Sequence, residues 1–273
     1  MTTSTSPWLI VVILGLVIIS PAYAMMSPEE IRAFEDQKAK ALKGNPDAQC
    51  NVAYYYEKGQ GVAKDLVQAA IWYRKAAEQG HPISQYNLGC LYDKGDGVKQ
   101  DNEEAFFWYR KAAEQGDAQA QSSLGVFYIM GKGVKSSGEK AVYWWRKAAG
   151  QGHAGAQYNL GLSTKMAETM FYFNPEEMSE RAISWWRKAA EQGHAQAQFE
   201  LANCYAIGEN VAKDEVEAYA YYNLAGITYA EAVKRLTILE KKLSRNEVAA
   251  GQKRSKELQK EIELKIESKK AGK

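Results

Sequence analysis

Apolar and polar positions recur along most of this chain with helical spacing, in two kinds of stretch that alternate. In the first kind, small or apolar residues fall four apart, as Ser84, Leu88 and Tyr92 do, so they share one helical face. The equivalent positions elsewhere are Ala48, Val52 and Tyr56; Ala120, Leu124 and Tyr128; and Ala197, Leu201 and Tyr205. The small residues beside the central position, which allow a neighbouring helix to approach, are Ala53, Gly89, Gly125, Gly161 and Ala202. Each such stretch predicts a helix, which we name helix A.

The second kind of stretch predicts another helix, named helix B. The residues that precede it, Asp65, Asp101, Ser137 and Asp214, are good N-caps. Glu104 and Glu217 stand three residues later, where a capping-box partner is expected. Helix B then carries a pair of adjacent aromatic residues: Trp72/Tyr73, Trp108/Tyr109, Trp144/Trp145, Trp185/Trp186 and Tyr221/Tyr222. Because large rings at helical spacing bury much area, we predict that these pairs form the core.

Glycines separate helix A from helix B. Helix A is predicted to end at Gly59, Gly95, Gly131 and Gly208, since glycine adopts the left-handed conformation that closes a helix. Two residues later stand Gly61, Gly97, Gly133 and, in the last unit, Asn210. A G-x-G motif can indicate a dinucleotide-binding loop, but that loop follows a strand, whereas this motif follows a helix. We interpret it as a turn.

The two helices form a unit that repeats five times. The phrase "WYRKAAEQG" at 72–80 returns unchanged at 108–116 and, with small changes, twice more. Units counted from the glycine that closes this phrase span residues 44–79, 80–115, 116–151, 152–192 and 193–227. A fixed period of this size is typical of a solenoid, in which each unit packs only on its neighbours. The sequence therefore predicts an all-α solenoid.

Residues on both sides of the repeats are predicted to cap the solenoid. Residues 25–43 read as one helix that begins after Ser27, with Ala33 and Ala41 at positions equivalent to helix B. Residues 228–273 read as a short helix spaced like helix A, followed by a long charged helix. The sparse apolar stripe of that charged helix consists of Val248, Leu258, Ile262 and Ile266.

The repeated pattern A-x-x-x-L-G-x-x-Y-x-x-G-x-G-V, followed by D-x-x-x-A-x-x-W-Y-R-K-A-A-E-Q-G, resembles the Sel1-like repeat family, a relative of the tetratricopeptide repeats. The resemblance covers residues 44–227. It implies a right-handed αα superhelix that serves as a scaffold or adaptor for other proteins. We expect no cofactor.

The composition is that of an ordinary globular protein with a sizeable core. The chain of 273 residues is 46% hydrophobic and 25% charged, with a net charge of +2. A nearly neutral balance argues against nucleic acid as the partner, since surfaces that bind nucleic acid are usually strongly basic. The expected partner is a protein or peptide.

The first 24 residues predict export. The run "WLIVVILGLVIIS" is short for a bilayer span and is followed by Ala22-Tyr23-Ala24, a small-x-small pattern typical of a signal peptidase site. Cleavage after Ala24 would leave a periplasmic or secreted chain of bacterial type. An uncleaved segment that anchors the chain in a membrane is the alternative.

Candidate chemistry is sparse. Cys50, Cys90 and Cys204 are odd in number and show no paired spacing, so each is expected as a small apolar residue in a helix. His81, His153 and His194 each follow the glycine that opens a unit, where they can bond free backbone N–H groups of helix A. They are expected to be spread along the solenoid, one per repeat, so neither a metal site nor a catalytic site is predicted.

A polar groove is the first candidate binding site. Asn51 and Lys58 lie seven residues apart, as do Asn87 and Lys94, so each pair shares one face of helix A. Stacked units would bring the four side chains together, bordered by Tyr55 and Tyr86; Asn159 occupies the equivalent place in the fourth unit. This arrangement resembles the one by which some tetratricopeptide proteins hold the carboxylate end of a partner. The alternative is a solvated helix surface with asparagines that help repeats to pack.

An apolar cluster in the fourth unit is the second candidate. Thr164 replaces the usual tyrosine, the glycine turn is missing, and an insertion brings Met170, Phe171 and Phe173 close in sequence. Insertions in repeats map to loops that often bind partners. Alternatively, helix A lengthens there and its aromatic residues pack on a neighbouring unit.

The leading functional prediction is a non-enzymatic adaptor in the cell envelope or exported space. Two alternatives are a hydrolase acting on the cell wall or on β-lactams, and a secreted effector that binds host proteins. One cysteine-rich branch of the family has been associated with β-lactam hydrolysis, but this chain lacks its regular cysteine pairing. No P-loop, G-x-S-x-G or H-E-x-x-H motif is present.

Overall fold

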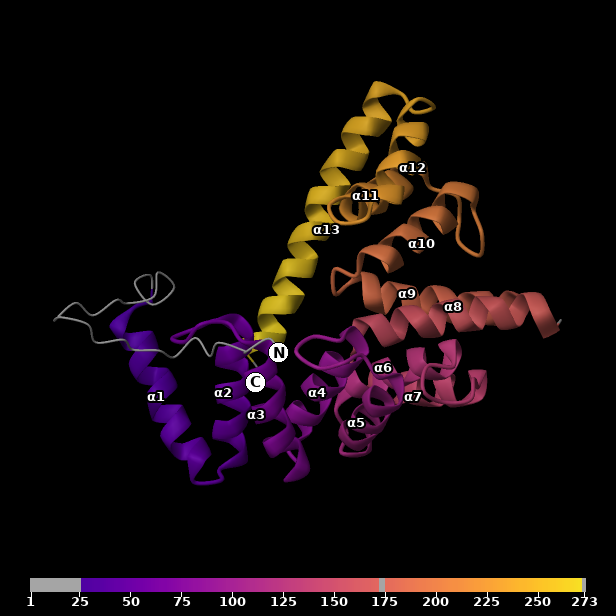
Figure 1. Ribbon diagram of the computed structural model, residues 1–273. Coiled ribbons are helices and arrows are strands. Elements are labelled where there is room, and N and C mark those ends of the chain that lie inside the picture. Colours follow the sequence, from indigo (N-terminus) through magenta and orange to yellow (C-terminus); the bar gives the residue numbers. More distant parts are fainter. Residues whose placement is uncertain (1–25, 172–174, 272–273) are drawn as a thin grey trace, which may run out of the picture. The chain divides into compact units, whose positions relative to one another are not determined.

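The computed structural model describes residues 26–171 and 175–271, which contain thirteen helices and no strand (Figure 1). The chain divides into two compact units, Met1–Gln115 and Gly116–Lys273. The first contains α1 (Pro28–Leu42), α2 (Pro46–Lys58), α3 (Leu66–Glu78), α4 (Pro82–Lys94) and α5 (Asn102–Glu114). The second contains α6 (Ala118–Met130), α7 (Gly138–Gly150), α8 (Ala154–Phe171), α9 (Pro175–Ala190), α10 (Ala195–Ile207), α11 (Glu215–Gly226), α12 (Ala230–Glu240) and α13 (Arg245–Ala271).

Helices pack with their sequence neighbours within each unit. The helices A and B of each repeat form the pairs α2/α3, α4/α5, α6/α7, α8/α9 and α10/α11. Within a unit, helix B also packs on the next helix A, as α3 does on α4, α7 on α8 and α9 on α10. The predicted all-α solenoid of five two-helix repeats is confirmed.

The helix ends follow the predicted turn chemistry. Gly59 ends α2 with φ 73°, and its N–H donates to the carbonyl oxygen of Tyr55. The other predicted closing glycines behave alike, and Asn210 takes φ 58° where earlier repeats have glycine. The G-x-G motif is therefore a turn, as predicted.

The capping-box prediction is wrong in part. Asp101 and Asp214 cap α5 and α11 as expected, but their own N–H groups donate to the carbonyl oxygens of Tyr92 and Tyr205. Glu104 is bound elsewhere: its carboxylate accepts a hydrogen bond from Trp108 Nε1 at 3.0 Å. Glu217 instead pairs with Arg254 at 2.9 Å. The preceding helix A thus supplies the acceptor that a capping box would provide.

The second aromatic residue of each pair fills the space above the small residue of helix A. Tyr73, Tyr109 and Trp186 are 0%, 3% and 1% exposed. A Cβ atom added at Gly161 would lie 2.2 Å from Trp186 Nε1, so glycine is required where the ring is an indole. The prediction that both members are core is only partly right, since Trp144 and Trp185 are half-buried.

The N-terminal capping helix also departs from the prediction. Its N-cap, Ser27, forms a complete capping box with Glu30. Ala33, expected at a core position, is exposed, and Phe34 is fully buried instead. The Phe34 ring meets Tyr55 and Tyr56 edge-on. Among the described residues no helix precedes α1, so Ala33 has no earlier helix A on which to pack.

The C-terminal segment ends in the predicted long helix. Leu258 and Ile262 of α13 are buried, and Val248 and Ile266 pack partly buried against the same core. Arg254 adds an ion pair to Glu217 of α11. This helix therefore covers the end of the second unit.

The fourth repeat contains the lengthened helix that was one of two expectations. Helix α8 has 18 residues, whereas α6 has 13. Met170 and Phe171 fall within α8, but their side chains lie outside the described part of the chain, and Phe173 and the export segment 1–24 lie outside the described residues altogether. None of the described helices is long and apolar enough to span a bilayer.

Candidate functional site

Three residues of the predicted polar groove line one pocket in the first unit. Lys58 at the end of α2, with Asn87 and Lys94 on α4, faces a cavity of about 410 Å³. The other lining residues are Glu57, Lys64, Leu66, Cys90, Leu91 and Asp96. The spacing argument thus placed the two lysines and one asparagine correctly, because α2 and α4 are consecutive helices A.

The groove combines an apolar floor with a charged rim. Leu91 is buried, and Lys58, Lys64 and Lys94 are exposed. Lys58 Nζ lies 2.6 Å from Glu57 Oε1, and this hydrogen bond raises the pKa of Lys58. Lys94 makes no ion pair within the described residues, so its charge is available to a ligand. Groups of this kind can bind a carboxylate through charge-assisted hydrogen bonds.

Glu57 is a part of the groove that the sequence analysis missed. Its Oε2 accepts a hydrogen bond from Tyr73 Oη at 2.9 Å while its Oε1 contacts Lys58. Burial, and then the Glu57 charge, raise the pKa of Tyr73, so the hydroxyl stays protonated and donates. The carboxylate therefore orients Lys58 and also competes with any anionic ligand for it.

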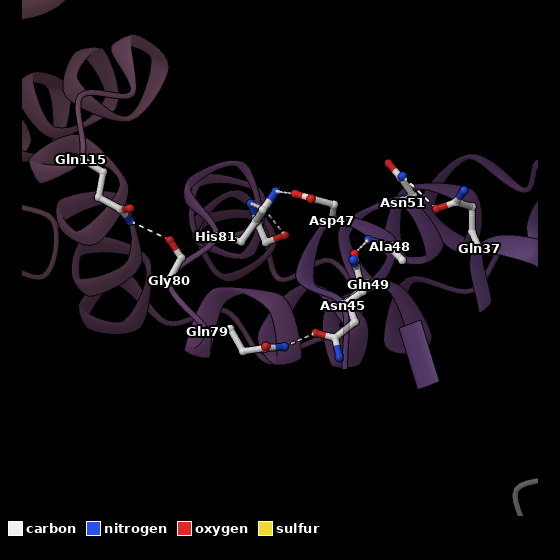
Figure 2. Close-up of polar contacts among 11 residues, drawn as sticks. Gln37, Asn45, Asp47, Ala48, Gln49, Asn51, Gln79, Gly80, His81 and Gln115 are labelled. Carbon is white, nitrogen blue, oxygen red and sulfur yellow. Dashed lines mark hydrogen bonds and ion pairs between the residues drawn. The ribbon is translucent and has the colours of Figure 1, made fainter. Parts of the chain in front are cut away.

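Asn51, Tyr55 and Tyr86 do not line this pocket. Asn51 Nδ2 donates to Gln37 Oε1 of α1 at 3.1 Å (Figure 2). Tyr55 packs edge-on against Phe34, with ring centroids 6.1 Å apart. Tyr86 packs against Tyr109 at 5.7 Å. These three side chains support packing between helices.

Asn159 lies in the second unit, half-buried on α8. The adjacent Tyr158 stacks on His194, with ring centroids 4.9 Å apart. No further member of the predicted Asn/Lys arrangement lies beside it, because Met130 and Ile207 stand where the earlier repeats have Lys58 and Lys94.

The histidines cap the N-termini of helices A, as their positions predict. The Nδ1 atoms of His81, His153 and His194 accept the backbone N–H of Ser84, Ala156 and Ala197 at 3.2, 3.1 and 3.3 Å. His81 Nε2 also lies 3.2 Å from Asp47 Oδ1 (Figure 2).

Two of the histidines are closer together than expected. A Cβ atom at Gly155 would lie 3.2 Å from the His153 ring and 4.0 Å from His194 Nε2. Burial lowers the pKa of both rings, and the charge of His153 lowers that of His194 further. Within the described residues, however, no three histidine, cysteine or acidic side chains gather as a metal site would require.

A ladder of glutamines, in which the inner member of each pair is buried, joins the repeats, and the sequence analysis missed it. Gln79 Nε2 donates to Gln49 Oε1 at 2.7 Å, and Gln49 Nε2 donates to the carbonyl oxygen of Ala41 at 3.2 Å (the first of these bonds is drawn in Figure 2). The outer pair recurs as Gln115 with Gln85, Gln151 with Gln121 and Gln192 with Gln157, at 2.7, 2.9 and 2.8 Å. Glutamine at two fixed positions of each of the first four units was the available signal.

The cysteines fit the structural role that was expected of them. Cys50 and Cys204 are buried, Cys90 is half-buried, and all three are free. Burial raises the pKa of all three thiols, to about 11 for Cys204, which leaves little reactive thiolate at neutral pH.

Comparison with known proteins identifies the repeat. A model of the Sel1 repeat matches residues 46–81, 82–117, 118–153, 154–194 and 195–226. The crystal structure of a Sel1 repeat protein from Oxalobacter formigenes is 30% identical, with a TM-score of 0.71 over 86% of this chain and 91% of that one. A protective antigen of uropathogenic Escherichia coli is 24% identical over 85% of this chain and 64% of its own, with a TM-score of 0.47. Among curated proteins the comparison gives no match.

Proposed function

Because the chain belongs to the Sel1 repeat family, whose members serve as scaffolds for protein interactions, we propose that it is a non-catalytic adaptor. It binds a protein or peptide in the groove between α2 and α4. The observation that carries this proposal is the convergence of Lys58, Asn87 and Lys94 on one pocket above Leu91.

The chemistry of the groove suits the free carboxylate end of a peptide. Lys94 supplies an unpaired charge, and the Asn87 amide, which also hydrogen-bonds the Tyr73 hydroxyl, supplies a second donor beside it. The apolar floor accommodates an aliphatic side chain of the peptide. Each charge-assisted hydrogen bond contributes about 1.5–3 kcal/mol when formed, so two such bonds would dominate the affinity of a short peptide.

The test compares matched peptides with a free or an amidated C-terminus, binding to the mature chain in a fluorescence anisotropy titration. Free-carboxylate peptides should bind more tightly, and Lys94→Glu should remove the difference. Lys99→Glu, an exposed charge reversal outside the groove, serves as the control. Equal binding of both peptide forms would refute a carboxylate site.

The insertion in the fourth repeat is the competing contact surface. Charge reversal at Lys58 and Lys94 is therefore compared with Phe171→Ala and Phe173→Ala in capture of the natural partner from the protein's own cells. Loss of capture only in the aromatic variant would transfer the binding function from the groove to the insertion.

We further propose that the adaptor works in the cell envelope or outside the cell. The support is the apolar segment before Ala24, with its small-x-small ending. N-terminal sequencing of the natural protein should find Met25 as the first residue. An intact Met1 in a cytoplasmic fraction would contradict export.

A further inference from the structure

The second unit contains a basic groove of its own, between α7, α8 and α9. Its volume is about 410 Å³. It is lined by Val142, Arg146, Leu160, Ser163, Thr164, Arg181, Ser184, Trp185 and Lys188. None of these residues belongs to the polar groove described above.

Two small residues open this groove. Ser163 and Thr164 stand where the other repeats carry larger pairs: Tyr55/Tyr56, Leu91/Tyr92, Phe127/Tyr128 and Cys204/Tyr205. Both hydroxyls donate to the carbonyl oxygen of Leu160, at 2.9 and 2.7 Å. Their protons are thus already used, and the space of a missing tyrosine ring is left above an apolar floor.

The replacement of tyrosine by Thr164 also deprives Arg146 of a contact that Arg74 makes at the same position of the first repeat. In the first repeat, Arg74 donates to Tyr92 Oη and lies 4.0 Å from Glu78. For Arg146 the tyrosine is replaced by Thr164 and the glutamate by Gly150. Arg146 is exposed and makes no ion pair within the described residues. Its guanidinium is therefore available at the mouth of the groove.

The lining combines cationic side chains with one aromatic ring. Arg146 and Lys188 supply positive charge for a ligand, and the lining as described contains no carboxylate. Lys188 Nζ lies 4.5 Å from the centre of the half-buried Trp185 ring. An anionic ligand with an aromatic side chain matches both features, because the ring replaces the missing tyrosine while the acid meets the cations.

We propose that this groove binds an acidic peptide segment, which inserts one aromatic side chain beside Thr164. The proposal rests on the function as a peptide-binding adaptor but concerns a separate site with a different specificity. A simple anion would use the cations and leave the apolar floor of Leu160 and Val142 uncovered, so a peptide fits the whole groove better.

Three labelled peptides test the proposal with the mature chain: an Asp/Glu-rich peptide with a central Phe, the same peptide with Ala for Phe, and a Lys-rich peptide with Phe. All have amidated C-termini, so that the carboxylate groove does not contribute. The acidic Phe peptide should bind best by fluorescence anisotropy. Its affinity should exceed that of the Ala peptide by about tenfold or more, as expected for one buried aromatic ring.

Variants locate the site. Thr164→Tyr restores the residue of the other repeats and should abolish the advantage of Phe over Ala. Arg146→Gln should weaken both acidic peptides by about tenfold, while Arg110→Gln, the same position in the second repeat, should have no effect. Circular dichroism checks that each variant keeps its helix content.

The outcomes separate this site from the first groove. Unchanged binding in both Thr164→Tyr and Arg146→Gln would overturn the proposal, as would equal binding of the Phe and Ala peptides. Loss of binding in Lys94→Glu but not in Arg146→Gln would assign the acidic peptide to the groove between α2 and α4 and would also refute the proposal. Each of these results can refute the acidic-peptide site while the carboxylate site between α2 and α4 still holds.

Discussion

The indole ring of Trp145 lies directly against Gly125 of the preceding helix A, and its Nε1–H donates to the carbonyl oxygen of Ser122 at 3.2 Å. A Cβ atom at Gly125 would stand 2.1 Å from that nitrogen. The repeats that carry alanine at this position, with Ala53 and Ala202, place a tyrosine opposite it. In the second repeat Tyr109 faces Gly89, so a tyrosine lies opposite either alanine or glycine, whereas Trp145 and Trp186 both face glycine. An indole ring on helix B thus requires glycine on helix A.

Gly125→Ala should lower the free energy of unfolding by about 1–3 kcal/mol, because the buried, hydrogen-bonded indole cannot move aside without strain. Gly150→Ala is the control, since nothing lies within 4 Å of a Cβ atom there. That change should stabilise α7 by up to about 1 kcal/mol through helix propensity. Urea unfolding measures both. Adding Trp145→Tyr should recover part of the loss in Gly125→Ala; a further, additive loss would contradict the matching of the two residues.

The glutamine ladder predicts a large effect at a buried polar residue. Gln85 Nε2 donates to the carbonyl oxygen of Ala77 at 3.1 Å, and its Oε1 accepts from Gln115 at 2.7 Å. The Ala77 carbonyl also accepts the N–H of Gly80, so Gln85→Leu removes one of its two donors and also removes the acceptor of Gln115 Nε2. The loss of two hydrogen bonds at about 1 kcal/mol each should cost about 2 kcal/mol. Gln115→Leu should cost about 1 kcal/mol, because Gln115 is exposed and its loss leaves only one buried acceptor unpaired. Similar small losses in both variants would mean that the ladder does not stabilise the stacking of the repeats.

The helix-capping histidines predict a loss of stability in mild acid. His153 and His194 must be neutral at Nδ1 to accept their N–H bonds, and their pKa values are lowered from the ordinary 6.5 by burial. Below pH 6.5 the unfolded chain therefore binds protons that the folded chain refuses, so the free energy of unfolding falls with pH until the folded histidines titrate as well. Above pH 6.5 this contribution is fully present.

Asparagine variants test this pH dependence. Asn45 caps α2 in the first repeat, so His153→Asn with His194→Asn should keep both caps while removing the titration. Urea unfolding of the variant should show a flatter decline below pH 6.5 than that of the parent chain. A decline of equal slope would assign the acid sensitivity to other groups.

The repeat architecture could be predicted because its determinants are local. The closing glycines and the N-caps act within one or two turns of a helix, and the 36-residue recurrence repeats these local signals along the chain. Gly59 and Asp65, for example, end and begin helices where the pattern placed them. The prediction for Ala33 failed because its expected burial depended on a preceding helix A, and no helix precedes α1 in the part of the chain that the structure describes. Position in a repeat predicts packing only where both neighbours exist.

The groove was predictable in part for a related reason. Helical spacing placed Lys58 and Lys94 on corresponding faces of α2 and α4, the helices A of consecutive repeats, and both residues line one pocket. Asn51 instead contacts Gln37, from a helix outside the repeats whose register no periodicity could supply. The second groove could be found only by comparing repeats in the structure. Arg74 contacts Tyr92 and Glu78, and Thr164 and Gly150 stand at the positions where Arg146 would find the same two partners.

The last helix offers a test of how the array is closed. On α13, Ile262 is 6% exposed and Leu264, two residues later, is 56% exposed. Ile262 packs in the core of the second unit, and its Cγ2 lies 3.7 Å from the position of a Cβ atom at Gly193. Ile262→Ala should therefore cost about 2–4 kcal/mol, whereas Leu264→Ala should change the free energy of unfolding by less than about 0.5 kcal/mol.

In a solenoid the loss of stability should stay near the substituted residue, because repeats contact only their neighbours. Hydrogen exchange should accordingly speed up in α13 and α11 of the Ile262 variant and remain unchanged in α2 to α5. Equal costs at the two positions would show that α13 does not rest on the repeats through this face. Faster exchange throughout the chain would show instead that the whole array unfolds as one cooperative body.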